Sequence, residues 1–198
     1  MSHIIVGLGN PGEEYENTRH NTGRIMLEAF AKTNDFPEFE FDKRLKALIS
    51  EGKIGKEKVL LIEPETFMNK SGLSVSPLIK SKKAAEHLVI IHDDLDIPFG
   101  KFKISFNKSA GGHRGVESVI RVVKTEGFVR VRVGICPITP AGKLKKPQGE
   151  EPVNKVILGK FSPDQRTVLK KLSNSVNTGL AVIVADGYQK AMSQQGSF

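Results

Sequence analysis

The sequence predicts one α/β domain over residues 1–198, with a mixed β-sheet whose central parallel strands are flanked by helices. Three observations support this fold class. The length suits a single domain with a well-filled core. Short apolar segments alternate with segments of helical periodicity, as in proteins where helices connect parallel strands. Two further strand segments are separated by only a short turn, so part of the sheet is expected to be antiparallel.

The first half of the chain is expected to contain three of the strands. Residues 3–8 are mostly apolar and end at a Gly-Asn-Pro-Gly turn, the pattern of a short buried strand. Residues 22–33 mix apolar and charged side chains and predict a helix. Residues 45–51 and 58–63 flank a Gly-Lys turn and predict a β-hairpin. Residues 68–83 also look helical, although they include a glycine and a proline.

Three more strands are expected from residue 88 onward. Residues 88–91 are an uninterrupted apolar run, typical of a strand buried on both faces. Residues 101–106 alternate polar and apolar side chains, as a half-exposed strand does. Residues 129–136 alternate Val and Arg, which predicts a strand with a basic outer face. Between these strands, residues 113–125 predict a helix that begins after two glycines.

The C-terminal part is expected to be a loop followed by helix. Residues 137–152 contain four prolines, two glycines and three lysines, which predicts a mobile loop. The loop is expected to lie within the domain, because strand and helix patterns resume near Val153. Residues 163–190 look mainly helical.

The chain carries a net charge of +8, and one segment accounts for all of the excess. Residues 101–146 contain eleven Lys and Arg against two Glu, a local charge of +9, which leaves −1 for the rest of the chain. Such clustering is expected of a phosphate-binding face. The alternative is that these side chains lie on solvated faces that point in different directions.

Other features narrow the class of protein. No apolar run approaches the ~20 residues of a membrane-spanning helix, so no membrane partner is expected. The N-terminus lacks the pattern of a secretory signal peptide, which predicts a cytoplasmic protein. A single cysteine, Cys136, excludes an intramolecular disulfide and a Cys-based zinc site. It follows a Val-rich run and is expected to be a packed core thiol.

The segment Gly7-Leu-Gly-Asn-Pro-Gly12 matches the G-x-G-x-x-G pattern of dinucleotide-binding loops, in which a helix N-terminus binds pyrophosphate. The residues that follow include Glu13, Glu14 and Glu16, whose carboxylates would stand where the phosphate binds. The alternative is a tight turn that presents Asn10 at the carboxyl end of a strand, a usual place for chemistry in α/β sheets.

Two polar segments suggest a general base. His20 lies in a polar stretch and is not expected to be a core residue. Asp93 follows a buried strand, in the run His92-Asp-Asp-Leu-Asp96. A His with a carboxylate that fixes its tautomer is a common general base. The same acidic run also suits a hard cation, because such ions prefer several oxygen ligands.

The sequence contains no serine in a G-x-S-x-G turn, so water activated by His20 is the simplest nucleophile for a hydrolase. The amides of Asn10 and Asn69 are candidates for polarising a carbonyl group, although many Asn side chains only cap helices.

A series of motifs extends along nearly the whole chain: Ile5-Val-Gly-Leu-Gly-Asn-Pro-Gly12, Tyr15, Thr18-Arg-His-Asn-Thr-Gly23, Thr66-Phe-Met-Asn-Lys-Ser-Gly72, His92-Asp-Asp-Leu-Asp-Ile-Pro-Phe-Gly100, Gly111-Gly-His-Arg-Gly115, Arg130-Val-Arg-Val-Gly134 and Val156-Ile-Leu-Gly159. In this order and spacing they resemble the bacterial-type peptidyl-tRNA hydrolase family. The resemblance implies an esterase that cleaves peptide from the 3′ ribose of tRNA and so recycles tRNA. Its partner would be peptidyl-tRNA, through the acceptor arm and 3′ end. We expect no metal, no cofactor and a monomer.

The resemblance also implies roles for individual residues. His20 would accept a proton from water, and Asp93 would hold and stabilise the basic form of His20. Asn10 would separate peptidyl from free aminoacyl substrates, and Asn69 would bind near the reacting carbonyl. The pocket for the terminal nucleotide and adjoining peptide would be lined by Tyr15 and Phe67.

The sequence departs from the family at two positions. Arg114 replaces the Asn of the usual Gly-Gly-His-Asn-Gly, an Asn that contacts substrate in the family. Arg114 has five N–H donors and no acceptor, which suits a backbone carbonyl or a tRNA phosphate. Ser105 stands where relatives often carry a basic residue for the 5′-phosphate. Lys103 and Arg132 are left for that contact, with Lys108 as a substitute, so weaker phosphate binding is expected.

Two other functions stay open from the sequence. One is a non-catalytic RNA-binding member of the family, which the joint presence of Asn10, His20, Asn69 and Asp93 argues against. The other is a nucleotide-dependent oxidoreductase, which the glycine pattern alone suggests and which would be indifferent to tRNA.

Overall fold

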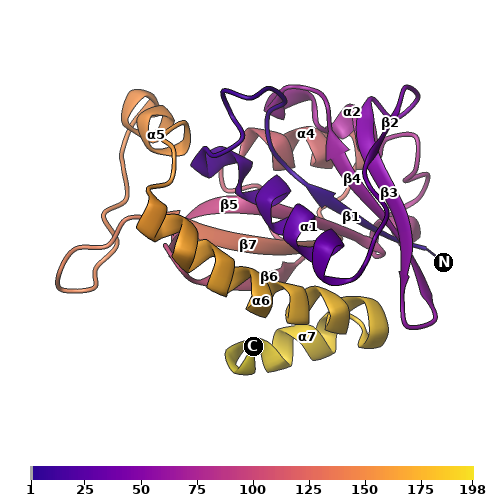
Figure 1. Cartoon of the computed structure of the whole chain (residues 1–198). Helices are drawn as coiled ribbons and strands as arrows, with labels where there is room; N and C mark the ends of the chain where they lie inside the picture. Colours follow the sequence, from indigo (N-terminus) through magenta and orange to yellow (C-terminus); the bar gives the residue numbers. More distant parts are fainter. Residues whose placement is uncertain (1) are drawn as a thin grey trace.

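A seven-stranded mixed sheet runs through the centre of the computed structural model, which describes residues 2–198 (Figure 1). Its strand order is β2-β3-β4-β1-β5-β7-β6. The strands are β1 (His3–Gly7), β2 (Glu40–Asp42), β3 (Ala47–Ile54), β4 (Glu57–Pro64), β5 (Leu88–Pro98), β6 (Phe102–Phe106) and β7 (Val129–Cys136).

Four central strands, β4, β1, β5 and β7, are parallel to one another, whereas β2, β3 and β6 are antiparallel to their neighbours. The predicted fold class is therefore confirmed. β1 ends at Gly7, which pairs with Ile91 of β5, so the turn that follows β1 lies beside the part of β5 that contains His92 and Asp93.

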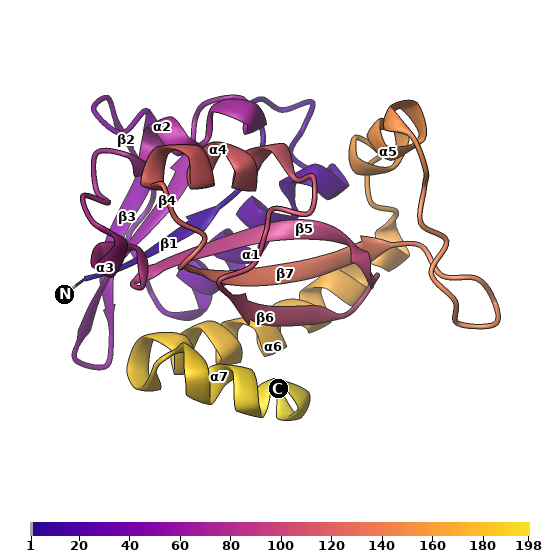
Figure 2. The same ribbon diagram turned by 180° about the vertical axis from the view of Figure 1, so that it is seen from behind.

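Helices cover both faces of the sheet (Figures 1 and 2). One face packs against α1, α6 and α7, and the other against α2 and α4. The helical segments are η1 (Arg19–Asn21), α1 (Thr22–Thr33), η2 (Met68–Lys70), α2 (Gly72–Val75), α3 (Lys82–Ala85), α4 (Arg114–Val123), α5 (Glu150–Ile157), α6 (Pro163–Asp186), α7 (Tyr188–Gln194) and η3 (Gln195–Ser197). Within residues 2–198, no helix combines the length and apolar character needed to cross a membrane.

The alternation of side chains along the central strands builds two hydrophobic cores. In β1, Ile5 belongs to the core beneath α1 and α6, whereas Val6 belongs to the core beneath α4. The same holds in β5, where Ile91 and Ile90 point to opposite faces. This is why β1 and the start of β5 are apolar without alternation, as expected of strands covered on both sides.

Two predicted helices are interrupted in the structure. The helix expected over residues 68–83 is wrong: η2, α2 and α3 are three short segments. Pro77 lies just beyond α2 and has no amide hydrogen with which to continue the helix. The helical stretch expected over residues 163–190 is divided into α6 and α7 by Gly187, which has a φ of 89°.

The basic outer face predicted for residues 129–136 is also wrong. All eight residues of β7 are buried, including Arg130 and Arg132. The segment between β6 and α4 passes over β7 (Figure 2), and Arg130 Nη1 donates a hydrogen bond to the Ser109 carbonyl at 2.7 Å. The polar positions of β7 are therefore buried against partners inside the fold, Arg130 against this loop and Arg132 against Asp94.

The segment predicted as a loop, residues 137–152, extends away from the body of the domain and leads into α5 (Figure 1). Ile138 and Leu144 form an isolated antiparallel bridge across it. Its last three residues differ from the prediction, because α5 begins at Glu150, with two Glu residues in its first turn. Negative side chains are favourable near a helix N-terminus, which explains the early start.

Candidate active site

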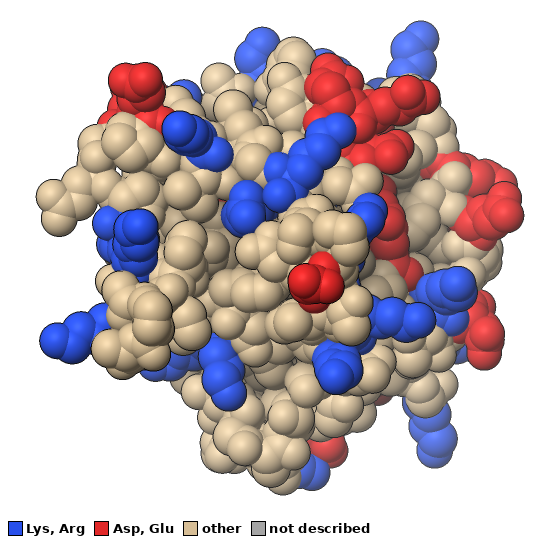
Figure 3. Space-filling view, turned by 60° about the vertical axis from the view of Figure 1, so that its left-hand side comes forward, with Lys and Arg blue, Asp and Glu red and all other residues tan. Residues whose placement is uncertain are grey.

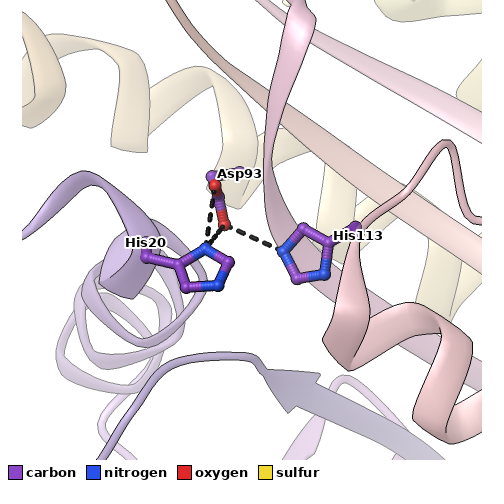
Figure 4. A group of neighbouring side chains, drawn as sticks. All are labelled: His20, Asp93 and His113. Carbon is purple, nitrogen blue, oxygen red and sulfur yellow. Dashed lines mark hydrogen bonds and ion pairs between the residues drawn. The ribbon is translucent and has the colours of Figure 1, made fainter. Parts of the chain in front are cut away.

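His20, Asp93 and His113 meet at the carboxyl edge of the sheet, although they come from three distant parts of the chain (Figure 4). His20 lies in η1, in the segment that follows β1, and His113 is the N-cap residue of α4. Asp93 lies within β5, not after it as predicted, because pairing with β7 extends to Asp94. All three side chains are at least nine-tenths buried.

The Asp93 carboxylate accepts hydrogen bonds from both imidazoles. His20 Nδ1 lies 3.0 and 3.1 Å from its two oxygens, and His113 Nε2 lies 2.9 Å from Oδ1. The amide groups of Gly115 and Val116 donate to His113 Nδ1, at 3.2 and 3.3 Å. His113 Nδ1 is therefore an acceptor, and its proton is on Nε2.

The two His residues consequently differ in what they can do. Both ring nitrogens of His113 are engaged, one as donor to Asp93 and one as N-cap of α4. Donation by His20 Nδ1 to Asp93 instead leaves the lone pair of His20 on Nε2. His20 also lines a cavity of about 580 Å³. It is the residue of the two that is able to accept a proton from a bound molecule.

The charges around this pair favour a protonatable His20 beside an ionised Asp93. Burial lowers the pKa of His20, but the charge and hydrogen bond of Asp93 outweigh burial and leave that pKa above 6.5. Burial likewise acts to raise the pKa of Asp93, and the neighbouring His20 and His113 hold it well below its usual range. His92 is fully buried, which lowers its pKa far below 6.5 and keeps it neutral.

A cation at this position competes with the hydrogen bonds just described. Ligand atoms of His20, Asp93 and His113 lie within 4.8 Å of one another. However, His113 Nε2 carries a proton and has no lone pair to offer a metal. The other carboxylates of the acidic run are paired elsewhere: Asp94 with Arg132 at 2.7 Å, and Asp96 with Lys146. The run His92–Asp96 therefore does not converge on one point.

Asn10 lies beside the His–Asp pair, in the turn after β1. Its backbone is held by the Asn21 side chain, which accepts from Asn10 N and donates to Asn10 O, both at 2.9 Å. Its own Oδ1 accepts a hydrogen bond from Met68 N at 2.8 Å. The amide Nδ2 of Asn10 is left as a donor at the edge of the cavity.

Five of the predicted site residues line this cavity, and four do not. The cavity is lined by Asn10, Tyr15, His20, Asp93 and Arg114, but not by Phe67, Asn69, Lys103 or Arg132. Phe67 is 59% exposed and Asn69 is also exposed, although the bond from Met68 places their segment beside Asn10. A larger cavity of about 770 Å³ shares Asn10 as a lining residue.

Two contributors to the cavity were missed in the sequence. His113 stands in the Gly-Gly-His-Arg-Gly motif, where a His after two glycines was an available signal for a functional N-cap. The helix α5 forms the opposite wall through Val153, Asn154 and Ile157. The prolines and lysines before α5 do not predict that this helix lines the cavity, because the contact forms only when the chain after β7 returns to the site.

Arg114 links the two walls at the mouth of the cavity. Its Nη2 forms an ion pair with Glu150, the first residue of α5. Both side chains are largely exposed, and ion pairs of this kind contribute about 0–1 kcal/mol. This ion pair therefore adds little to the free energy that holds α4 and α5 together at the mouth of the cavity.

The basic residues of the 101–146 segment do not form a single face. Lys103 is exposed on β6 and pairs across the sheet with Arg132, which is 7% exposed and bound to Asp94. Ser105 pairs with the buried Arg130. Figure 3 shows acidic atoms gathered mainly at the right of the face seen there, with basic atoms spread over the rest. Two of the eleven basic side chains of this segment, Arg130 and Arg132, are therefore inside the fold and contribute neither to a phosphate-binding face nor to a solvated patch.

Comparison with known proteins places the whole chain in one family. A family model described as peptidyl-tRNA hydrolase matches residues 4–197. A peptidyl-tRNA hydrolase of Herpetosiphon aurantiacus is 40% identical over 192 residues, which cover 96% of this chain and 87% of that protein. One of Aquifex aeolicus is 38% identical over 170 residues, with 85% and 83% covered. The crystal structure of peptidyl-tRNA hydrolase from Acinetobacter baumannii superposes with a TM-score of 0.86 at 29% identity, covering 100% of this chain and 95% of that one.

Proposed function

The chain belongs to the peptidyl-tRNA hydrolase family, and from this we propose that it cleaves the ester bond of peptidyl-tRNA with a water molecule activated by the His20–Asp93 pair. Family membership makes it a hydrolase of peptidyl-tRNA that returns tRNA to translation. The observation that carries the mechanism is the contact between His20 Nδ1 and a buried, ionised Asp93 in the wall of a cavity. It leaves a basic Nε2 where a substrate can bind.

In the proposed reaction, water near His20 Nε2 attacks the carbonyl carbon of the ester, and its proton passes to Nε2. Asp93 stabilises the imidazolium that forms. When the bond between the carbonyl carbon and the ribose oxygen breaks, that oxygen takes the proton from Nε2. The peptide leaves with a free carboxyl group, and His20 returns to its neutral form.

Asn10 is proposed to distinguish peptidyl from aminoacyl esters. Its Nδ2 is a donor at the edge of the cavity, since Oδ1 is occupied by Met68 N. Beyond the reacting ester, a peptidyl substrate has an amide carbonyl that accepts such a bond. A free aminoacyl group has an ammonium there, which cannot accept one. Asn69, one residue beyond Met68, is proposed to bind near the reacting carbonyl.

The tRNA end is proposed to lie across the mouth of the cavity. Tyr15 in the cavity wall and the exposed Phe67 offer rings on which the terminal base can stack. Arg114 at the rim and the exposed Lys103 are proposed phosphate contacts. Arg132 was expected to join them, but its side chain is 7% exposed and bound to Asp94, so Lys103 beside it is the group that reaches the surface. We expect the protein to act in the cytoplasm as a monomer on the acceptor arm.

Hydrolysis of N-acetyl-aminoacyl-tRNA by wild type and His20→Ala tests this proposal. We expect wild type to release tRNA and His20→Ala to lose at least ~10²-fold in kcat, the low end for a general base. His87→Ala is the matched control, because His87 packs against His3 outside the site and should leave kcat unchanged.

Two outcomes would contradict the proposal. Loss of less than ~10²-fold in His20→Ala excludes His20 as the general base. A wild-type protein that binds tRNA without hydrolysing any ester would instead be the non-catalytic RNA-binding member of the family.

A further inference from the structure

Arg24 lines the larger cavity together with Asn10, does not line the cavity of the His–Asp pair, and has no part in the proposed reaction. It belongs to α1 and is 8% exposed. Its Nη1 donates a hydrogen bond to the carbonyl oxygen of Asn10 at 3.3 Å. Asn10 O is thus held by two donors from the same part of the chain, Arg24 and Asn21.

The apolar stem of Arg24 also contacts the backbone next to Asn10. A Cβ atom placed on Gly9 would lie 2.5 Å from Arg24 Cδ and 2.7 Å from Cγ. Gly9 therefore leaves the space that the Arg24 stem fills. The guanidinium of Arg24 thus contacts Asn10, and its apolar stem contacts Gly9, the residue before it in the same turn.

Two carboxylates hold the guanidinium in place: Glu63, which lies in β4, and Glu65, which follows the end of that strand. Nε and Nη2 of Arg24 each lie 3.3 Å from Glu63 Oε2, and Nη2 also pairs with Glu65. β4 runs alongside β1, with Ile62 paired to Val6, so its carboxyl end reaches this turn. Glu63 is 3% exposed, and its Oε1 has no hydrogen-bond partner. Burying a carboxylate with an unpaired oxygen costs free energy, and the fold nevertheless keeps Glu63 buried next to the turn.

We propose that Arg24, held by Glu63 and Glu65, is a positioning residue that sets the placement of the Asn10 amide and hence the preference for peptidyl over aminoacyl esters. This inference rests on the proposed function. The planar guanidinium is suited to the task because it binds the two carboxylates and the Asn10 carbonyl at once, through separate N–H groups. Lysine at this position keeps the positive charge but lacks the separate, coplanar N–H groups of the guanidinium.

The test measures kcat/KM for N-acetyl-aminoacyl-tRNA and for the unblocked aminoacyl-tRNA in wild type, Arg24→Lys and Arg24→Leu. We expect the ratio of the two values to fall about tenfold in both variants, since misplacement of a binding group by about 1 Å can cost up to ~10²-fold. Because both substrates are assayed with one preparation, the ratio does not depend on the folded fraction. Arg166→Leu, an exposed arginine of α6 on the neighbouring cavity, is the matched control and should leave the ratio unchanged.

Thermal unfolding separates positioning from a purely structural role. Arg24→Lys keeps a cation between the carboxylates, so we expect its melting temperature to stay near that of wild type while its ratio falls. An unchanged ratio in both variants overturns the inference and leaves the proposed function intact. A wild type that does not hydrolyse N-acetyl-aminoacyl-tRNA overturns the proposed function itself, and this is seen before any variant is compared.

Discussion

Asp93 accepts hydrogen bonds from two imidazoles, yet only His20 retains a free lone pair. The difference arises from what each second ring nitrogen contacts. His113 Nδ1 accepts hydrogen bonds from the amide groups of Gly115 and Val116 in the first turn of α4, whereas His20 lines the cavity and its Nε2 has no such contact within residues 2–198. At the scale of single residues, the contacts of the second ring nitrogen thus leave His20 able to accept a proton and His113 unable to do so.

The pH dependence of hydrolysis should report the His20–Asp93 pair. His20 acts as a base only when neutral, and Asp93 leaves its pKa above 6.5. We therefore expect kcat/KM to rise with pH through a value above 6.5 and then to level off, measured across about pH 5 to 8. In Asp93→Asn the acidic limb should move to lower pH, because burial then lowers the pKa of His20 without opposition, while the plateau rate falls. An acidic limb that does not move in Asp93→Asn contradicts the pairing.

Arg114→Asn, which restores the family's usual residue, should retain activity within about threefold. The ion pair of Arg114 with Glu150 is exposed, and such pairs contribute about 0–1 kcal/mol. Glu150→Gln is the matched control, because it breaks the same pair and leaves Arg114 in place. If steady-state kinetics show a large loss in Arg114→Asn and none in Glu150→Gln, Arg114 has a role in this protein that the family's usual Asn does not supply.

The element that places the site is α1, which begins at Thr22, directly after η1, and packs against Leu8 just after β1 and Ile91 within β5. The close approach of α1 to the backbone of β5 and of Leu8 depends on Gly23, in the first turn of α1. A Cβ atom there would lie 2.3 Å from the Ile91 carbonyl oxygen and 2.5 Å from the Leu8 backbone, atoms that cannot move independently. The distance between η1 and β5, and so between His20 and Asp93, follows from this contact.

Gly23→Ala is accordingly expected to lower the free energy of unfolding by about 2–3 kcal/mol, as overpacking of a filled interior does. The His20–Asp93 contact should be disturbed as well, which lowers kcat. Chemical denaturation and steady-state kinetics measure the two effects. Gly196→Ala serves as the control, since a Cβ atom at Gly196 meets nothing within 4 Å. Wild-type stability in Gly23→Ala would show that α1 adjusts freely.

At the scale of the whole molecule, the net charge of +8 is divided between buried and exposed groups. Arg130 and Arg132 satisfy partners inside the fold, whereas Lys103 remains on the surface. Acidic groups are gathered on one part of the face shown in Figure 3. The charge on that face is therefore unevenly distributed.

The affinity for tRNA should still fall steeply as salt rises, because each phosphate contact releases bound counterions. We expect Lys103→Gln to reduce the slope of log Kd against log salt by about 1. Lys32→Gln, a matched change on α1, should leave the slope unaltered. Equal slopes for Lys103→Gln and wild type in a filter-binding titration would remove Lys103 from the interface.

Periodicity and local motifs alone determined the fold class, most strand positions, and the candidates Asn10, His20 and Asp93, because these features depend on neighbouring residues. The helix expected at 68–83 failed because Pro77 interrupted an otherwise helical pattern. Which charges are buried, which of the two imidazoles beside Asp93 keeps a free lone pair, and how Arg24 and Arg114 are held were decided only by the tertiary structure. Those outcomes depend on contacts such as His20–Asp93 and Arg24–Glu63, which join residues 73 and 39 positions apart. No local pattern records them, because the partners become neighbours only when the parallel strands assemble.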